Sequence, residues 1–173
     1  MKKRVFKLFW AWQDDQENKW LEKMAEEGWK LLKYNLLVYT FEKMDPKKYI
    51  YKTDFKSNQN HDLQEYLALF EDAGWEHVTH YAGWHYFRTE PGKAKTPDIY
   101  TDVNSKVEMF RRLLWFLLMP LMAIIIIACT IVFNDSYSHI KLMVVLKITY
   151  VLLICLLGFS VLNILYKMKK LKE

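Results

Sequence analysis

Two long apolar runs set the last third of the chain apart from the rest. The run Leu113–Phe133 holds no charged residue. As a helix rising about 1.5 Å per residue it would cover roughly 30 Å, the thickness of a bilayer's hydrocarbon core. A second run extends over Ile148–Leu165, and the segment Asn134–Lys141 between them is too short to hold a domain. The pattern predicts a transmembrane hairpin at 111–168, with helices at 113–133 and about 145–166, and a tail at 169–173.

The hydrophobic pattern before this hairpin alternates between strand and helix periods. Arg4–Trp10 is short, aromatic and β-branched, which favours a strand. Asp14 and Glu17 fit a capping box, in which the first side chain caps a helix and the second bonds back to it. The apolar positions that follow fall on one helical stripe, and Gly28 ends the helix. The stripe consists of Trp20, Leu21, Met24 and Ala25.

The same order of elements is then written a second time. Asn35 divides two strand-like runs into a hairpin, and after a further strand the polar residues Asn58–Asn60 offer caps for a second helix. At a constant offset of 46 residues, aromatic, glycine and leucine positions coincide without a gap. The matches are Phe9 with Phe55, Gln13 with Gln59, Leu21 with Leu67, Gly28-Trp29 with Gly74-Trp75, and Phe41 with Phe87.

This duplication predicts an α+β fold. Each unit reads strand, helix, strand, strand, and two units would build an antiparallel sheet backed by two helices. The predicted segments are a soluble domain at 1–92, repeat units at about 4–45 and 50–90, and a linker at 93–110. In element order the pattern resembles gyrase-inhibitor-like and heme-binding SOUL-type duplicated domains, with a ferredoxin-like arrangement as the alternative.

Two stretches resemble a known family at the level of residues. They are FKLFWAWQDDQENKWLEKMAEEGWKLL at Phe6–Leu32 and FEDAGWE at Phe70–Glu76. Both are similar to the uncharacterised family named domain of unknown function 2812. That resemblance covers about the first hundred residues and implies membrane helices after the domain. It also implies a genomic setting beside regulators of the PadR type, which suits a membrane sensor or accessory component. It supplies no catalytic residues.

Charge divides the chain at the same place as hydropathy. Residues 1–105 carry 16 Lys/Arg against 17 Asp/Glu, whereas residues 106–173 carry 9 against 3. The basic excess therefore flanks the apolar runs, which disfavours direct nucleic-acid binding. By the positive-inside rule, we expect a multi-pass protein of the cell membrane with both termini cytoplasmic. The basic flanking residues are Lys106, Arg111, Arg112, Lys167, Lys169, Lys170 and Lys172.

An apolar sheet face is the candidate binding site. If the matched aromatics point at the helices, the strand residues of opposite parity point away from them. That face is too apolar for plain solvent exposure. It could bind a flat or lipophilic small molecule, a partner chain or the membrane surface, or register errors could have scattered core residues onto it. The candidate residues are Trp10, Tyr34, Val38, Ile50, Trp84 and Tyr86, with Asp54 and His80 as polar anchors.

The sequence offers little to support catalysis or metal binding. His77 and His80 differ in strand parity, so we expect them on opposite faces, unable to share an ion. The chain has no Gly-rich phosphate loop, no Cys-x-x-Cys pair and no serine in a nucleophile elbow. We therefore predict that the protein is not an enzyme and has no cofactor and no metal.

These features together favour a binding function at a membrane. The leading prediction is a membrane-anchored cytoplasmic module that binds a ligand or a protein partner and acts as a sensor or regulatory accessory. The lipid bilayer is the expected surface, with a protein partner in or at the membrane. The alternative is a structural or assembly subunit of a membrane transport complex that acts through its hairpin.

Overall fold

The structure, a computed structural model, describes residues 1–56, 63–96, 98–100, 102–132 and 141–173. It divides the chain into two compact units, Met1–Met109 and Phe110–Glu173. The predicted caps at Asn58–Asn60, the end of the first apolar run at Phe133 and most of the segment between the two runs lie outside the described residues.

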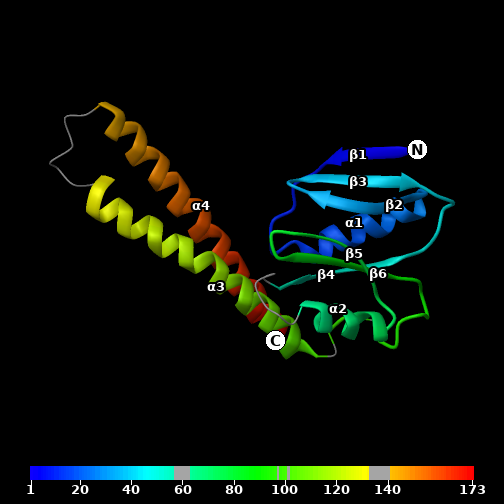
Figure 1. The fold of residues 1–173 in the computed structure, drawn as a ribbon. Coiled ribbons are helices and arrows are strands. Elements are labelled where there is room, and N and C mark those ends of the chain that lie inside the picture. The colour runs from blue at the N-terminus through cyan, green and yellow to red at the C-terminus, as the bar shows by residue number, and fades with distance from the viewer. Residues whose placement is uncertain (57–62, 97, 101, 133–140) are drawn as a thin grey trace. The chain divides into compact units, whose positions relative to one another are not determined.

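The first unit contains two three-stranded antiparallel sheets and two covering helices (Figure 1). Sheet A has the strand order β1-β3-β2 and sheet B the order β4-β6-β5. The α+β prediction is confirmed, with the strands in two sheets. The elements of the first repeat are β1 (Lys2–Phe6), α1 (Asp14–Glu26), β2 (Trp29–Asn35) and β3 (Val38–Lys43). Those of the second are β4 (Ile50–Phe55), α2 (Leu63–Asp72), β5 (Glu76–Tyr81) and β6 (Trp84–Thr89).

The duplication extends to the irregularities of the strands. A β-bulge between Leu31 and Lys33 interrupts β2, and a second one between His77 and Thr79 interrupts β5, at the same offset of 46 residues. The two-residue hairpin turns Leu36–Leu37 and Ala82–Gly83 also correspond, and all four turn residues have positive φ. A bulge adds one residue to a strand and so reverses the facing of the residues that follow it.

Gly28 and Gly74 end their helices as predicted. Both have left-handed backbones, with φ of +84° and +89°. A Cβ at Gly28 would lie 2.8 Å from the Met44 carbonyl oxygen, and one at Gly74 would lie 2.7 Å from that of Lys93. Only glycine fits both the conformation and the space.

Helix α1 connects the two sheets through one core. Its buried stripe, Leu21, Met24 and Ala25, packs in one cluster with residues of both sheets. The sheet residues of that cluster are Leu31, Tyr39 and Phe41 from sheet A and Tyr51 and Tyr86 from sheet B.

Helix α2 covers the opposite face of sheet B. The rings of Phe70 and Phe87 stack with centroids 4.3 Å apart, and Tyr66 meets the edge of His85 at 5.5 Å. Sheet B is therefore covered on both faces.

Side chains of sheet B bind the backbone of β2 at its bulge. Arg88 donates from Nη1 to the Leu31 carbonyl oxygen at 3.0 Å, and the Tyr51 hydroxyl accepts from the Leu31 amide at 3.4 Å. Arg88 also binds both carboxylate oxygens of Glu76, with Nε 2.7 Å from Oε2. These bonds satisfy backbone groups of β2, which is an edge strand of sheet A.

The start of α1 differs from the prediction. The first strand ends at Phe6, before the predicted Trp10, and the helix begins at Asp14 after Gln13. No side chain caps the helix, so the predicted capping box of Asp14 and Glu17 is wrong. The physical reason is burial: Glu17 is 8% exposed and bonds to two tyrosines of the sheets instead of the helix backbone.

The second unit is built from the two apolar helices. The structure has α3 (Val103–Ile127), a π-helical turn η1 (Ala128–Val132) and α4 (Lys141–Lys172). Candidate spans run over Val103–Thr130 and Met143–Lys172, with mean hydropathies of 2.6 and 2.4. Only 17% and 11% of their apolar windows are buried, unlike the core helix of a soluble protein. The Lys167 ammonium lies 5.1 Å from the centre of the Phe110 ring, at the start of the unit.

Candidate functional site

A cavity of about 220 Å³ opens in the first unit where the two repeats meet. The segment between β1 and α1, the first turn of α1, the end of β2 and the β5–β6 hairpin all contribute to its wall. Six of the ten lining side chains are aromatic. The lining residues are Phe9, Trp10, Ala11, Asp14, Glu17, Tyr34, Tyr81, Ala82, Trp84 and Tyr86.

A buried carboxyl group, Glu17, lies in this wall. The hydroxyls of Tyr39 and Tyr86 both donate to its Oε1, at 2.6 Å and 2.7 Å. Tyr39 belongs to sheet A and Tyr86 to sheet B, so Glu17 ties both repeats to α1. Its second oxygen, Oε2, accepts no hydrogen bond from any residue in the described part of the chain.

Burial shifts the proton affinities of this group. Loss of water around the carboxyl raises the pKa of Glu17, against the two tyrosine hydrogen bonds, which lower it. Burial and the nearby Glu17 carboxyl also raise the pKa values of Tyr39 and Tyr86, so both hydroxyls keep their protons and act as donors. A positive charge in the cavity would therefore stabilise the ionised form of Glu17.

A second carboxylate, Asp14, lies one helical turn before Glu17 on the same face of α1. It is 3% exposed, and its Oδ2 is 3.3 Å from the ammonium of Lys106, which also contacts Asp15 at 2.8 Å. Lys106 is thus shared between two carboxylates. The N-terminal turn of a helix attracts negative charge, and the first turn of α1 is acidic.

The aromatic wall is formed by side chains from both repeats. Tyr34 lies 5.2 Å from Tyr86 and 5.7 Å from Tyr81, measured between ring centres. Trp10 stacks on Trp12 at 5.3 Å and is 36% exposed. A ligand would meet ring faces from two repeats in this cavity.

The structure distributes the eight predicted site residues over three places. Trp10, Tyr34, Trp84 and Tyr86 line the cavity. Three others lie on the α2 face of sheet B, since they pair in register with Thr89 or His85: they are Ile50, Asp54 and His80. Val38 lies on the outer face of sheet A, in a separate pocket.

The expected free apolar face does not exist in this form. Tyr34 pairs with Tyr39 and shares its face toward α1, because the bulge at Leu31/Lys33 reverses the parity. Tyr86 points away from α2 as predicted, yet it is 3% exposed because α1 and sheet A cover that face. The parity argument also fails for Phe55, which pairs with Trp84.

The prediction for His77 and His80 is wrong for the same reason. The bulge at His77/Thr79 brings both onto the face of His85, with ring centres 6.0 Å apart. The His85 Nδ1 lies 3.3 Å from the His77 Nε2. Burial lowers the pKa values of both, that of His85 to about 4. Among the described residues, no three His, Cys, Asp or Glu side chains are placed to hold a metal ion.

Asp54 is bound by two tyrosines. The Tyr66 hydroxyl of α2 donates to its Oδ2 at 2.7 Å, and the Tyr100 hydroxyl donates to its Oδ1 at 2.7 Å. Tyr100 belongs to the predicted linker, which also contacts the domain through the Lys95 amide and the Ala73 carbonyl oxygen at 2.9 Å. Asp54 therefore fixes the linker to sheet B.

Sequence reasoning missed Glu17, Asp14 and Tyr81 as parts of the cavity. A signal for the first was present: Glu17 lies four residues before Leu21 and seven before Met24, on the apolar stripe of α1. A carboxyl group on a buried stripe needs hydrogen-bond partners, and the tyrosines of the strands can supply them.

A duplicated α+β domain followed by two long apolar helices defines the structural class of this protein. The chain belongs to the family described as protein of unknown function (DUF2812), whose family model matches residues 13–122. That range includes α1, every strand except β1, and most of α3. No curated protein and no solved structure matches the chain, so the gyrase-inhibitor-like resemblance stays a prediction.

Proposed function

We propose that this protein is a membrane-anchored module that binds a small ligand in the cavity between its repeats. The observation that carries the proposal is a buried carboxyl group, Glu17, in an aromatic wall, with one oxygen bonded to two tyrosines and the other without a described partner. A cavity of about 220 Å³ is smaller than the roughly 300 Å³ at which drug-sized sites begin, so the ligand is small.

The chemistry of the wall suits an organic cation. Aromatic faces attract cations through their quadrupole, most strongly where water is excluded. Asp14 and Glu17 offer two carboxyl groups, whereas Lys106 supplies one positive charge that Asp15 also shares. A primary or quaternary amine with a small apolar part would balance this charge and fill the aromatic space.

Anchoring to lipid explains the second unit. The exposed surface of α3 and α4 is apolar over lengths that can cross a bilayer. The basic residues at both outer ends support, by the positive-inside rule, a cytoplasmic location for both termini. A tag on the amino terminus should then be inaccessible from outside intact cells, and the chain should sediment with membranes unless detergent is added. A chain that stays in the supernatant would contradict the anchoring.

The ion pair at the cavity wall supports a sensor role. Lys106 lies in the first turn of α3, and it holds Asp14 and Asp15 of α1. A cationic ligand beside Asp14 would compete with Lys106 for that carboxylate. Ligand binding would thereby change a contact at the base of the first apolar helix, which is how the signal would leave the domain.

Binding can be measured on the full chain in neutral lipid nanodiscs. The probe is benzylamine, and benzyl alcohol is its neutral counterpart of nearly equal size. We expect saturable binding of benzylamine and roughly tenfold weaker binding of the alcohol, since a charge-assisted contact exceeds a neutral one by about 1.4 kcal/mol.

Two variants and a control locate the site. Glu17→Gln should weaken benzylamine binding, and Trp84→Ala should weaken both probes by removing the aromatic wall. Glu26→Gln, which removes a charge from an exposed part of α1, should leave both unchanged. Equal binding of the two probes would refute the cation, and binding that survives Trp84→Ala would refute the cavity.

A further inference from the structure

The outer face of sheet A carries an unusual row of side chains. In the register of the sheet, Arg4 of β1 and Lys33 of β2 both pair with Thr40 of β3. Tyr39 and Phe41 face the core, so Thr40 and its two cross-strand partners face outward. Two cations therefore flank one hydroxyl across three strands.

The neighbouring row has an acidic residue between its two cations, which the row of Arg4, Thr40 and Lys33 lacks. Lys2 and Lys30 both pair with Glu42, two residues from Thr40 on the same face. There an acidic side chain stands between the two cations, which is the favourable cross-strand arrangement. In the Arg4 row a threonine occupies that central place. Within the described part of the chain, neither Arg4 nor Lys33 has an ion-pair partner.

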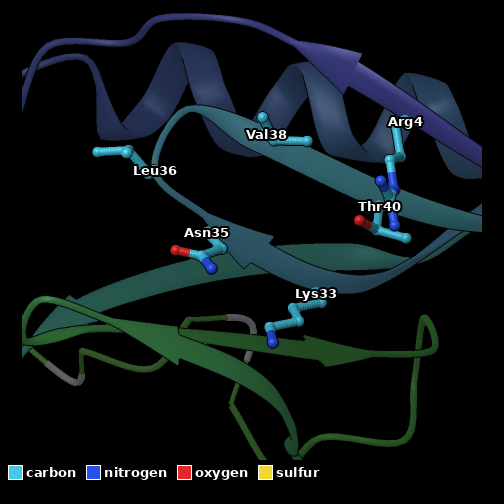
Figure 2. A pocket seen from close by; sticks show the side chains of 6 residues that line it. All are labelled: Arg4, Lys33, Asn35, Leu36, Val38 and Thr40. Atoms are coloured by element: carbon cyan, nitrogen blue, oxygen red, sulfur yellow. The ribbon is translucent and has the colours of Figure 1, made fainter.

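A pocket of about 410 Å³ lies over this row (Figure 2). Figure 2 shows Arg4 beside Thr40, with Lys33 on the next strand, Asn35 and Val38 in the adjoining row, and Leu36 at the turn. Neighbouring strands are about 4.8 Å apart, a span that the flexible stem of a lysine can bridge. The pocket thus combines two cations and two neutral polar side chains with a small apolar rim.

We infer that this pocket binds a phosphoryl group. The guanidinium of Arg4 provides paired N–H donors that match phosphate oxygens, the Lys33 ammonium adds a second charge, and Thr40 and Asn35 supply neutral donors. Leu36 and Val38 border the carbon part of the ligand. The site is separate from the cavity of the proposed function, because it lies on the opposite face of sheet A.

Two arms of one experiment distinguish a lipid headgroup from a soluble phosphate. In the first, full-length protein in phosphatidylcholine nanodiscs is titrated with glycerol 3-phosphate, followed by the phosphorus NMR signal of the monoester. In the second, detergent-solubilised protein is titrated with phosphatidic acid or phosphatidylcholine, and bound lipids are counted by native mass spectrometry. We expect saturable binding of the phosphate monoester in at least one arm, that is, of glycerol 3-phosphate in the first or of phosphatidic acid over phosphatidylcholine in the second.

Two pairs of variants distinguish binding in this pocket from attraction to any positive charge on the same face of sheet A. Arg4→Gln with Lys33→Gln should weaken binding by roughly tenfold or more, because two charge-assisted contacts are lost. Lys2→Gln with Lys30→Gln removes the same charge from the same face and should change binding by less than about threefold. All four side chains lie at the surface, so circular dichroism should show an intact fold. No binding in either arm, or equal weakening by both pairs, would overturn the inference.

Discussion

Replacing Glu17 by two different residues tests whether the buried carboxyl group is shared as the structure shows. In Glu17→Gln, the amide oxygen can still accept the hydroxyls of Tyr39 and Tyr86, which now donate at 2.6 Å and 2.7 Å. In Glu17→Ala, both hydroxyls lose their acceptor. The tyrosines are 1% and 3% exposed, so only water that enters through the cavity could replace it.

The expected change in the free energy of unfolding follows from these contacts. A buried hydroxyl without a partner costs about 1–3 kcal/mol, so Glu17→Ala should lower the free energy of unfolding by roughly 2–6 kcal/mol. Glu17→Gln keeps the acceptor and removes a carboxyl group whose ionised form is poorly solvated. At neutral pH it should therefore be as stable as the natural protein or more stable.

The pH dependence of the stability tests the role of the Glu17 carboxyl group independently. Burial raises the pKa of Glu17, so the folded state holds its proton more tightly than the unfolded state. Below the ordinary value of about 4.5 both states are protonated and the full stability is present. Stability is lost as pH rises from there through the raised pKa, by up to about 1.4 kcal/mol per pH unit. Glu17→Gln should lack this loss.

The assay is urea unfolding of the full chain in nanodiscs, followed by near-ultraviolet circular dichroism at pH 4.5 and pH 7.5. Glu26→Gln on the exposed side of α1 is the control and should behave as the natural protein. If Glu17→Gln destabilises the domain at pH 7.5 as much as Glu17→Ala does, the shared hydrogen bonds do not carry the stability, and the reasoning is wrong.

Three further predictions concern the backbone and the second repeat. Leu36 and Leu37 have φ of 40° and 67°, so replacing them by Asn and Gly should raise the free energy of unfolding by roughly 1–3 kcal/mol in urea titrations. Gly28→Ala combines a φ of +84° with a Cβ 2.8 Å from a carbonyl oxygen, whereas at Gly92 φ is +82° and nothing lies within 4 Å. Gly28→Ala should therefore lower the free energy of unfolding more than Gly92→Ala does. Equal losses would contradict the clash. The pKa of His85 is lowered to about 4, so the unfolded state binds this proton first and stability should fall as pH drops from about 6.5 to 4. His85→Phe should reduce that fall. An NMR titration of His85 with a pKa near 6.5 would contradict this prediction.

The order of elements was predictable because it depends on local signals. Helical stripes, glycines at helix ends and the offset of 46 residues all act within one repeat. The arrangement of strands in two sheets depends instead on how the repeats meet. There α1 packs on both sheets, and Arg88 binds the Leu31 carbonyl oxygen. No periodicity within either repeat encodes those contacts.

The candidate site was half predictable for a related reason. The aromatic residues Trp10, Tyr34, Trp84 and Tyr86 were chosen by parity, and the cavity brings them together. The same parity argument misplaced His80 and the facing of Tyr34, because a bulge reverses alternation and leaves no clear mark in sequence. Both bulges occur at equivalent positions, so an internal repeat can reveal such a feature once one copy is known.

The most direct test of the binding site observes the carboxyl group of Glu17 itself. Full-length protein labelled with ¹³C at glutamate side-chain carboxyls, held in nanodiscs, is titrated with benzylamine, and the Glu17 signal is assigned by its absence in Glu17→Gln. The account predicts that the pH at which this resonance titrates moves down as the amine saturates the cavity, while the exposed Glu26 signal stays in place. A Glu17 signal that does not respond at saturating benzylamine would contradict it.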